Sequence, residues 1–163
     1  MSVDNRISLN IVRMELQDCQ KDAELFGWDI SEIDESNHVF TVKMISPIDD
    51  EGYKMEIRFD DYKELPLLIE FIDPKTGEKG TKNAYPADGG GKAGNLFHNH
   101  PCICHPCSRK AYKGYSNVHA NDWNLIGWQQ NPKVDTLTNI RAILRAVYFR
   151  ISNAEIYKGR MHG

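Results

Sequence analysis

The residues with the clearest chemical potential gather in one short stretch of this 163-residue chain. Three thiols and three imidazoles fall within ten consecutive positions, at Cys102, Cys104, Cys107, His98, His100 and His105. Such side chains supply either a thiolate nucleophile or soft ligands for a metal such as zinc. The spacing therefore predicts thiol chemistry or metal binding within residues 97–109.

In a first interpretation, one of these thiols attacks an acyl carbon. A nucleophile of this kind needs partial exposure, nearby positive charge that stabilises the thiolate, and donors aimed at the developing oxyanion. Arg109, Lys110 and the neighbouring histidines are candidates for the charge. Asn99 or a backbone N–H is a candidate for the donor.

Two other interpretations remain open for the same segment. A tetrahedral zinc site would use Cys102, Cys104, Cys107 and one histidine. Zinc sites generally take a second pair of ligands from a distant part of the chain, whereas here every ligand is local and two prolines stiffen the backbone. Alternatively, the cysteines are small buried hydrophobic residues and the histidines are hydrogen-bonded loop residues.

The composition limits the class of protein. The chain is 40% hydrophobic and 26% charged, and no segment approaches the roughly 18 apolar residues of a membrane span. Its 20 basic and 23 acidic residues leave a formal charge of −3 without a basic block, which argues against nucleic-acid binding. The polar start, MSVDNRIS, shows no signal peptide, so we expect a reducing, cytoplasmic setting. We expect one domain over residues 1–163, with neither a membrane nor a nucleic acid as partner.

Hydrophobic periodicity predicts a helix followed by a meander of strands. Apolar residues recur at steps of three and four over residues 7–26, which predicts an amphipathic helix that Asn5 or Ser8 caps and Gly27 ends. Alternation of apolar and polar residues then predicts antiparallel strands. These strands are expected at residues 28–33, the weakest candidate, and at 39–45, 53–59 and 67–72.

Residues 78–130 show no sustained period, and so long an irregular connection usually carries function. A second helix follows, which Asp135 or Thr136 can cap and which we expect to pack on the sheet. Its apolar positions are Leu137, Ile140, Leu144, Val147 and Ile151. The chain is therefore predicted to be α+β, with an N-terminal helix, a four-stranded antiparallel meander sheet, a long irregular active-site segment and a C-terminal helix.

This order of elements resembles the ubiquitin-conjugating enzyme family. In that family a strand ending in Phe leads through a turn containing Tyr and Pro to a further strand, as residues 57–73 do here. The family then carries a His-Pro-Asn motif, a catalytic cysteine in an Ile-Cys-Leu-like context, a Trp-x-Pro motif and a Thr-capped helix. The similar pieces of this chain are His100-Pro101, Ile103-Cys104-His105, Trp128 with Pro132, and Thr136-Leu137. The resemblance extends over about residues 8–152.

The chain also departs from the family pattern. Cys102 stands where Asn would follow His100-Pro101, and Asn99 is the amide that would replace it. Extra residues lie between Cys104 and Trp128, and little of the chain follows the second long helix. It is therefore similar to a divergent, shortened member, like the conjugating-type proteins of bacterial ubiquitin-like operons.

The resemblance implies a UBC-like fold and an acyltransferase that carries a ubiquitin-like modifier as a thioester on Cys104. An activating enzyme of the ThiF type would supply the modifier, and a protein or another amine acceptor would receive it, without a cofactor. Aminolysis needs an oxyanion donor and a base. We expect Asn99 or His100 as the donor and Asp122 or His119 as the base.

Two alternatives remain within the same resemblance. Cys107, and after it Cys102, would be the nucleophile if Cys104 is not. The other alternative is a catalytically inactive UBC/RWD-like interaction module that holds zinc through Cys102, Cys104, Cys107 and His98.

Overall fold

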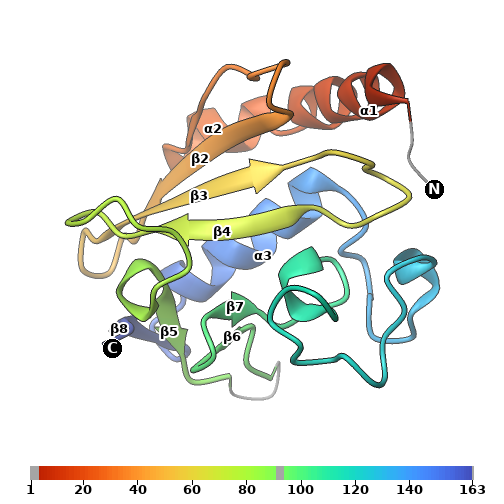
Figure 1. Cartoon of the computed structure of the whole chain (residues 1–163). Coiled ribbons are helices and arrows are strands. Elements are labelled where there is room, and N and C mark those ends of the chain that lie inside the picture. The colour runs from red at the N-terminus through yellow and green to blue at the C-terminus, as the bar shows by residue number, and fades with distance from the viewer. Residues whose placement is uncertain (1–3, 91–93, 163) are drawn as a thin grey trace.

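The computed structural model describes residues 4–90 and 94–162 and has a mixed α+β architecture (Figure 1). Residues 1–3, 91–93 and 163 of the predicted domain lie outside the described part. Within the described part the helices are α1 (Asn5–Gln17), α2 (Gln20–Phe26) and α3 (Ile140–Ser152). The strands of the main sheet are β1 (Asp29–Ile30), β2 (Val39–Ile45), β3 (Gly52–Arg58) and β4 (Leu68–Ile72).

The main sheet is an antiparallel meander in the order β1-β2-β3-β4, as predicted. Alternate residues of its strands are buried on one face, and the register places Phe40 opposite Ile57 and Met55 opposite Phe71. The other face carries charged residues such as Lys54. Helix α3 runs behind the sheet in Figure 1, and its apolar residues join the same buried cluster as the strands. Every second residue of β2, β3 and β4 is buried between the sheet and α3, which explains why a sequence that alternates apolar and polar residues forms this sheet.

The predicted first helix is interrupted. α1 ends at Gln17 and α2 begins at Gln20, with Asp18 and Cys19 between them. The predicted caps at Asn5 and Ser8 are wrong, because the Asp4 side chain accepts a hydrogen bond from the backbone N–H of Arg6 and caps α1. Ser8 is instead buried within the helix. The predicted ending at Gly27 is confirmed by its left-handed backbone, with a φ of 74°.

The second helix begins later than predicted. Neither Asp135 nor Thr136 caps it, because the Asn139 side chain accepts a hydrogen bond from the backbone N–H of Ala142. Leu137 therefore lies before α3, although it still packs against the core. From Ile140 onward the apolar positions of the helix are buried as the periodicity predicts.

The irregular segment contains short elements that its sequence did not reveal. Strand β5 (Pro86–Asp88) pairs with β8 (Tyr157–Arg160), and β6 (Phe97–His98) pairs with β7 (Cys102–Ile103). Short 3₁₀ helices lie at Lys82–Ala84, Arg109–Ala111 and Trp128–Gln130. Such short strands have no readable periodicity, and β5 finds its partner far along the chain. In the described part, no helix has the length and apolar character needed to cross a membrane.

A partly buried ion-pair group joins α2 to α3. The Asp22 side chain is 4% exposed and accepts hydrogen bonds from Arg141 and from Arg145 at 2.8–3.0 Å. The hydrogen bonds from Arg145 and Arg141 lower the pKa of the Asp22 carboxyl from 3.8 to about 2, against the opposing effect of burial. The ionised carboxylate therefore holds the two helices together.

Replacement of this carboxylate tests its contribution. Because one partner is buried and the arginines are half exposed, Asp22→Asn should lower the free energy of unfolding by about 2 kcal/mol near neutral pH. A lowered pKa means that the stabilisation is present above pH 3.8 and is lost as the pH falls towards about 2. Denaturant unfolding at several pH values should show the difference between wild type and variant narrowing over that range. The exposed Glu24→Gln on α2 is the matched control, and a difference that stays constant with pH would contradict this role.

Candidate active site

Cys104 is the most accessible thiol of the chain. All four cysteines lie in the described part and are free; Cys19, Cys102 and Cys107 are buried, whereas Cys104 has intermediate exposure. Cys104 directly follows β7, and its backbone N–H donates to the carbonyl of Leu96 at 2.9 Å. The small β6–β7 ladder therefore fixes the backbone beside the sulfur.

The Cys104 sulfur is in contact with an imidazole. Its Sγ lies 3.1 Å from Nε2 of His119, and Nδ1 of His119 lies 3.1 Å from both carboxylate oxygens of Asp122. A proton on Nδ1 that is donated to Asp122 leaves Nε2 unprotonated, so that Nε2 can accept the thiol proton. The structure thus brings three of the predicted residues together as a thiol, a base and a carboxylate that orients the base.

An aromatic stack fixes the plane of the imidazole. The rings of His119 and Trp123 are 3.5 Å apart with an angle of 8° between them, and Trp123 in turn packs against Tyr112. The hydroxyl of Tyr112 donates to the carbonyl of Pro106 at 2.7 Å. Trp123 was not predicted as a site residue, although its position four residues after His119 was a visible signal.

Buried polar contacts attach this segment to the main sheet. The Arg109 side chain is 3% exposed and donates to the Pro66 carbonyl at 2.9 Å, and to the side chain and backbone carbonyl of Asp60. The backbone N–H of Arg109 donates to Leu67, next to a parallel bridge between Leu67 and Ser108. The residues just after the thiol are therefore held along the β4 edge.

These contacts change the roles expected for two cations. Arg109 and Lys110 were candidates for stabilising the thiolate, but Arg109 pairs with Asp60 and Lys110 pairs with Glu70 at 2.9 Å. Both charges are engaged at the sheet. The positive charge that acts on Cys104 comes instead from Lys133.

The electrostatic surroundings keep Cys104 protonated in the absence of a base. Burial raises the pKa of the Cys104 thiol above its ordinary value of 9.0, and the negative charge of Asp122 raises it further, while Lys133 opposes them. The thiolate is therefore scarce near neutral pH. An adjacent proton acceptor is needed for reaction, and His119 is placed to be that acceptor.

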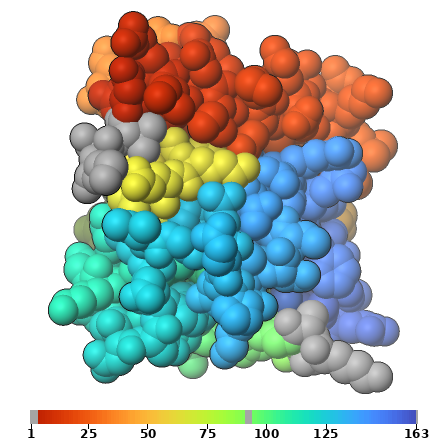
Figure 2. All heavy atoms as spheres, turned by 90° about the vertical axis from the view of Figure 1, so that its right-hand side faces the viewer, coloured from red at the N-terminus to blue at the C-terminus, as the bar shows by residue number. Residues whose placement is uncertain are grey.

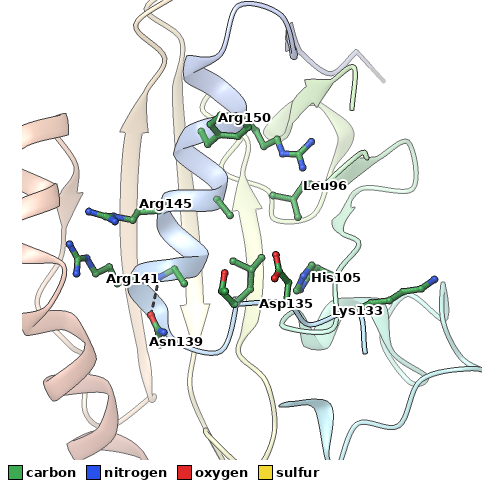
Figure 3. A pocket seen from close by; sticks show the side chains of 13 residues that line it. Leu96, His105, Lys133, Asp135, Asn139, Arg141, Arg145 and Arg150 are labelled. Atoms are coloured by element: carbon green, nitrogen blue, oxygen red, sulfur yellow. Dashed lines mark hydrogen bonds between the residues drawn. The ribbon is translucent and has the colours of Figure 1, made fainter. Parts of the chain in front are cut away.

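A groove follows α3 (Figure 3), and its lining includes His105, the residue after Cys104, but not the Cys104 side chain itself. Its volume is about 830 Å³. One side is lined by Leu96, whose carbonyl accepts from the backbone N–H of Cys104, and by His105, the next residue in the chain. Burial lowers the pKa of His105 to about 4, so this imidazole is neutral near neutral pH; its Nδ1 accepts from the N–H of Cys107 at 3.1 Å. In Figure 3, Asp135 lies beside His105, and Arg141 and Arg145 point away towards the neighbouring helix.

Residues of the irregular segment form the surface beside α3 and the groove. In Figure 2 its green and cyan residues form a continuous surface below α1 and beside α3. Along α3 the groove extends from Asn139 to Arg150, a length of ~16 Å at 1.5 Å per residue. An extended peptide of roughly five residues matches that length.

Asn99 and His100 do not lie next to the thiol. Both are exposed in the turn between β6 and β7, whereas Cys104 lies opposite Leu96 at the other end of this hairpin. Asn99 is three residues after Leu96, so the two positions lie about 10 Å apart along the extended strand. The structure therefore does not bring these two predicted oxyanion donors to Cys104.

The predicted zinc ligands are not assembled as a site. No group of three or more His, Cys, Asp or Glu side chains within residues 4–90 and 94–162 is arranged to hold a metal ion. Cys102 and Cys107 are fully buried, and burial raises the pKa of the Cys102 thiol to about 11 and that of Cys107 further still. These buried thiols are also poor substitutes for Cys104 as nucleophile.

Comparisons with protein families, with curated proteins and with solved structures found no match to this chain. The functional interpretation therefore depends on the residues and the geometry described above.

Alkylation should distinguish Cys104 from the other three cysteines. Brief treatment of the native protein with iodoacetamide at neutral pH should modify Cys104 alone, because the other sulfurs are buried. Peptide mass spectrometry locates the adduct, and Cys104→Ala should remain unmodified. Equal labelling of Cys102 or Cys107 in the folded protein would show that the accessible thiol has been misidentified.

The pH dependence of the same reaction tests His119. Without the imidazole, thiolate forms only as the pH rises towards a pKa above 9.0, so His119→Gln should slow alkylation at neutral pH by about tenfold or more and leave it fast only at alkaline pH. His100→Gln is the matched control, since His100 lies at the hairpin turn. Identical pH profiles for wild type and His119→Gln would mean that the imidazole is not the proton acceptor.

Proposed function

We propose that this protein is a ubiquitin-conjugating-like acyltransferase that carries a ubiquitin-like modifier as a thioester on Cys104. The single observation that carries the proposal is the partly exposed Cys104 thiol, whose sulfur lies 3.1 Å from Nε2 of His119. A thiol with an adjacent base and open space on one side is suited to accept an acyl group.

The order of elements supports a UBC-like fold. Helices α1 and α2 precede a four-stranded antiparallel meander, the thiol follows in an irregular segment, and a Trp-containing turn leads to helix α3. Trp128 is buried and its indole N–H donates to the Lys63 carbonyl at 3.0 Å, which ties that turn to the connection before β4. Trp128, one of the residues of the family resemblance, thus has a packed position beside the main sheet.

The first step is thioester exchange. The Cys104 thiol transfers its proton to His119, and the sulfur attacks the thioester carbonyl of the loaded activating enzyme, which leaves as a thiolate. The attacking and leaving groups are alike, so little acid catalysis is needed. In the second step an amine attacks the Cys104 thioester, and His119 is the nearest base for the proton that the amine loses.

The proposal includes the partners that the chemistry requires. An activating enzyme of the ThiF type supplies the modifier, and a protein or another amine acceptor receives it. We expect no resident cofactor, and a cytoplasmic location in which free thiols stay reduced.

The direct test is formation of a thioester. The protein should be incubated with its activating enzyme, the modifier and ATP, and analysed by gel electrophoresis with and without reductant. Wild type should form an adduct that reductant removes, and Cys104→Ala should form none. Cys102→Ala, a matched change at a buried thiol two residues away, should retain the adduct. An adduct that survives in Cys104→Ala would disprove the assigned nucleophile.

A further inference from the structure

A protein that only carries a thioester does not need a group that protonates the leaving group, yet His119 is placed beside Cys104 to do so. Exchange between two thioesters expels a thiolate, which leaves without taking a proton. An amide is different, because its nitrogen is a poor leaving group until a general acid protonates it. His119 contacts the nucleophilic sulfur, and Asp122 and Trp123 hold its ring in one plane, so it is placed both to accept and to return a proton.

We propose that Cys104, His119 and Asp122 also cleave amide bonds, so that the protein is a cysteine amidase acting on a peptide or isopeptide bond whose acyl segment lies in the groove along α3. The inference rests on the same thiol as the proposed function, but it requires neither an activating enzyme nor a ubiquitin-like donor. A thiol, an imidazole within hydrogen-bond reach and a carboxylate on the far ring nitrogen constitute the arrangement that activates nucleophiles in unrelated hydrolases.

The acylation half of the reaction balances within these residues. His119 Nε2 takes the proton of the Cys104 thiol, and the sulfur forms a C–S bond to the amide carbonyl. The C–N bond then breaks, and His119 gives the same proton to the departing nitrogen. The products of this half are a free amine and a thioester on Cys104.

Water completes the cycle. His119 takes a proton from a water molecule, whose oxygen attacks the thioester carbonyl. The C–S bond breaks, the sulfur recovers the proton from His119, and a carboxylic acid is released. The sum is amide plus water giving amine plus acid, with no oxidant or reductant.

The groove indicates which acyl segments fit. Its apolar lining includes Leu96, Leu137 and Phe149. Its charged lining residues are Lys133, Asp135 and Arg150, which also lies 3.9 Å from Asp88, whereas Arg141 and Arg145 point away and pair with Asp22. An extended acyl segment that combines apolar and acidic side chains is complementary to such a lining. Lys133, whose charge already favours the Cys104 thiolate, also favours negative charge on the developing oxyanion.

The experiment compares two leaving groups on one peptide. The probe is acetyl-Asp-Glu-Leu-Gly-Gly, prepared as the aminomethylcoumarin amide and as the thiobenzyl ester. Glycine is placed at the scissile carbonyl because it adds the least steric hindrance near a half-buried sulfur. Wild type should turn over both compounds, and Cys104→Ala should turn over neither.

The decisive readout is the ratio of amide to thioester turnover. Only the amide needs a proton on its leaving group, so His119→Gln should lower this ratio by about 100-fold or more. Asp122 acts through His119 as a positioning residue, and Asp122→Asn should lower the ratio by about tenfold and shift its pH profile. His100→Gln, the matched control, should keep the wild-type ratio. Because a ratio compares two substrates on one preparation, partial loss of folded protein does not change it.

The outcomes separate this inference from the proposed function. Thioester turnover without amide cleavage by wild type would overturn the amidase and leave the thioester carrier standing. A ratio unchanged in His119→Gln would also overturn it, since the imidazole would then not protonate the nitrogen. Reaction of neither compound, in a protein that still forms the reductant-sensitive adduct, would overturn the amidase alone.

Discussion

The buried guanidinium of Arg109 is the contact on which the rest of the site depends. It joins the residues that follow Cys104 to the connection before β4 through Pro66 and Asp60, and its own backbone N–H bonds to Leu67. An irregular segment has little periodic structure to hold it in place, so its geometry must come from such specific polar contacts. A guanidinium suits this role because its several donors lie in one rigid plane. The position of the thiol relative to the sheet is thus set by a residue that does not itself touch the sulfur.

The sequence predicted the regular part of the fold well. Strands β2, β3 and β4 appear close to their predicted bounds, because alternation is a direct consequence of burying one face of an antiparallel sheet. The errors at helix starts have one cause. Several polar residues near each start can act as caps, and the choice of Asp4 and Asn139 depends on where the backbone turns.

The candidate site could be predicted only in part. Cys104, His119 and Asp122 were recognised by residue type, and their contact depends on how the chain folds back over the 15 positions from Cys104 to His119. That return uses the left-handed backbone of Asn117, with a φ of 64°, and a hydrogen bond from the backbone N–H of His119 to the carbonyl of Ala111, neither of which the periodicity of the sequence specifies. Asn99 and His100 illustrate the converse. They are close to Cys104 in sequence, but a β-hairpin carries its turn away from its open end.

The two reactions proposed for Cys104 differ mainly in the leaving group. A thiolate leaves unaided, and an amine leaves only with a proton, so the same sulfur serves both once a proton donor is beside it. The described geometry supplies that donor within the chain itself.

The stacking of His119 on Trp123 also affects when the protein loses side-chain conformational entropy. A solitary imidazole on a loop rotates about two bonds, and a reaction that needs one orientation must wait for it and lose that entropy at the barrier. Here the indole restricts the rotation when the chain folds, so the loss is incurred before any ligand arrives. The ring is preorganised, and the face that the indole covers is closed to approaching molecules.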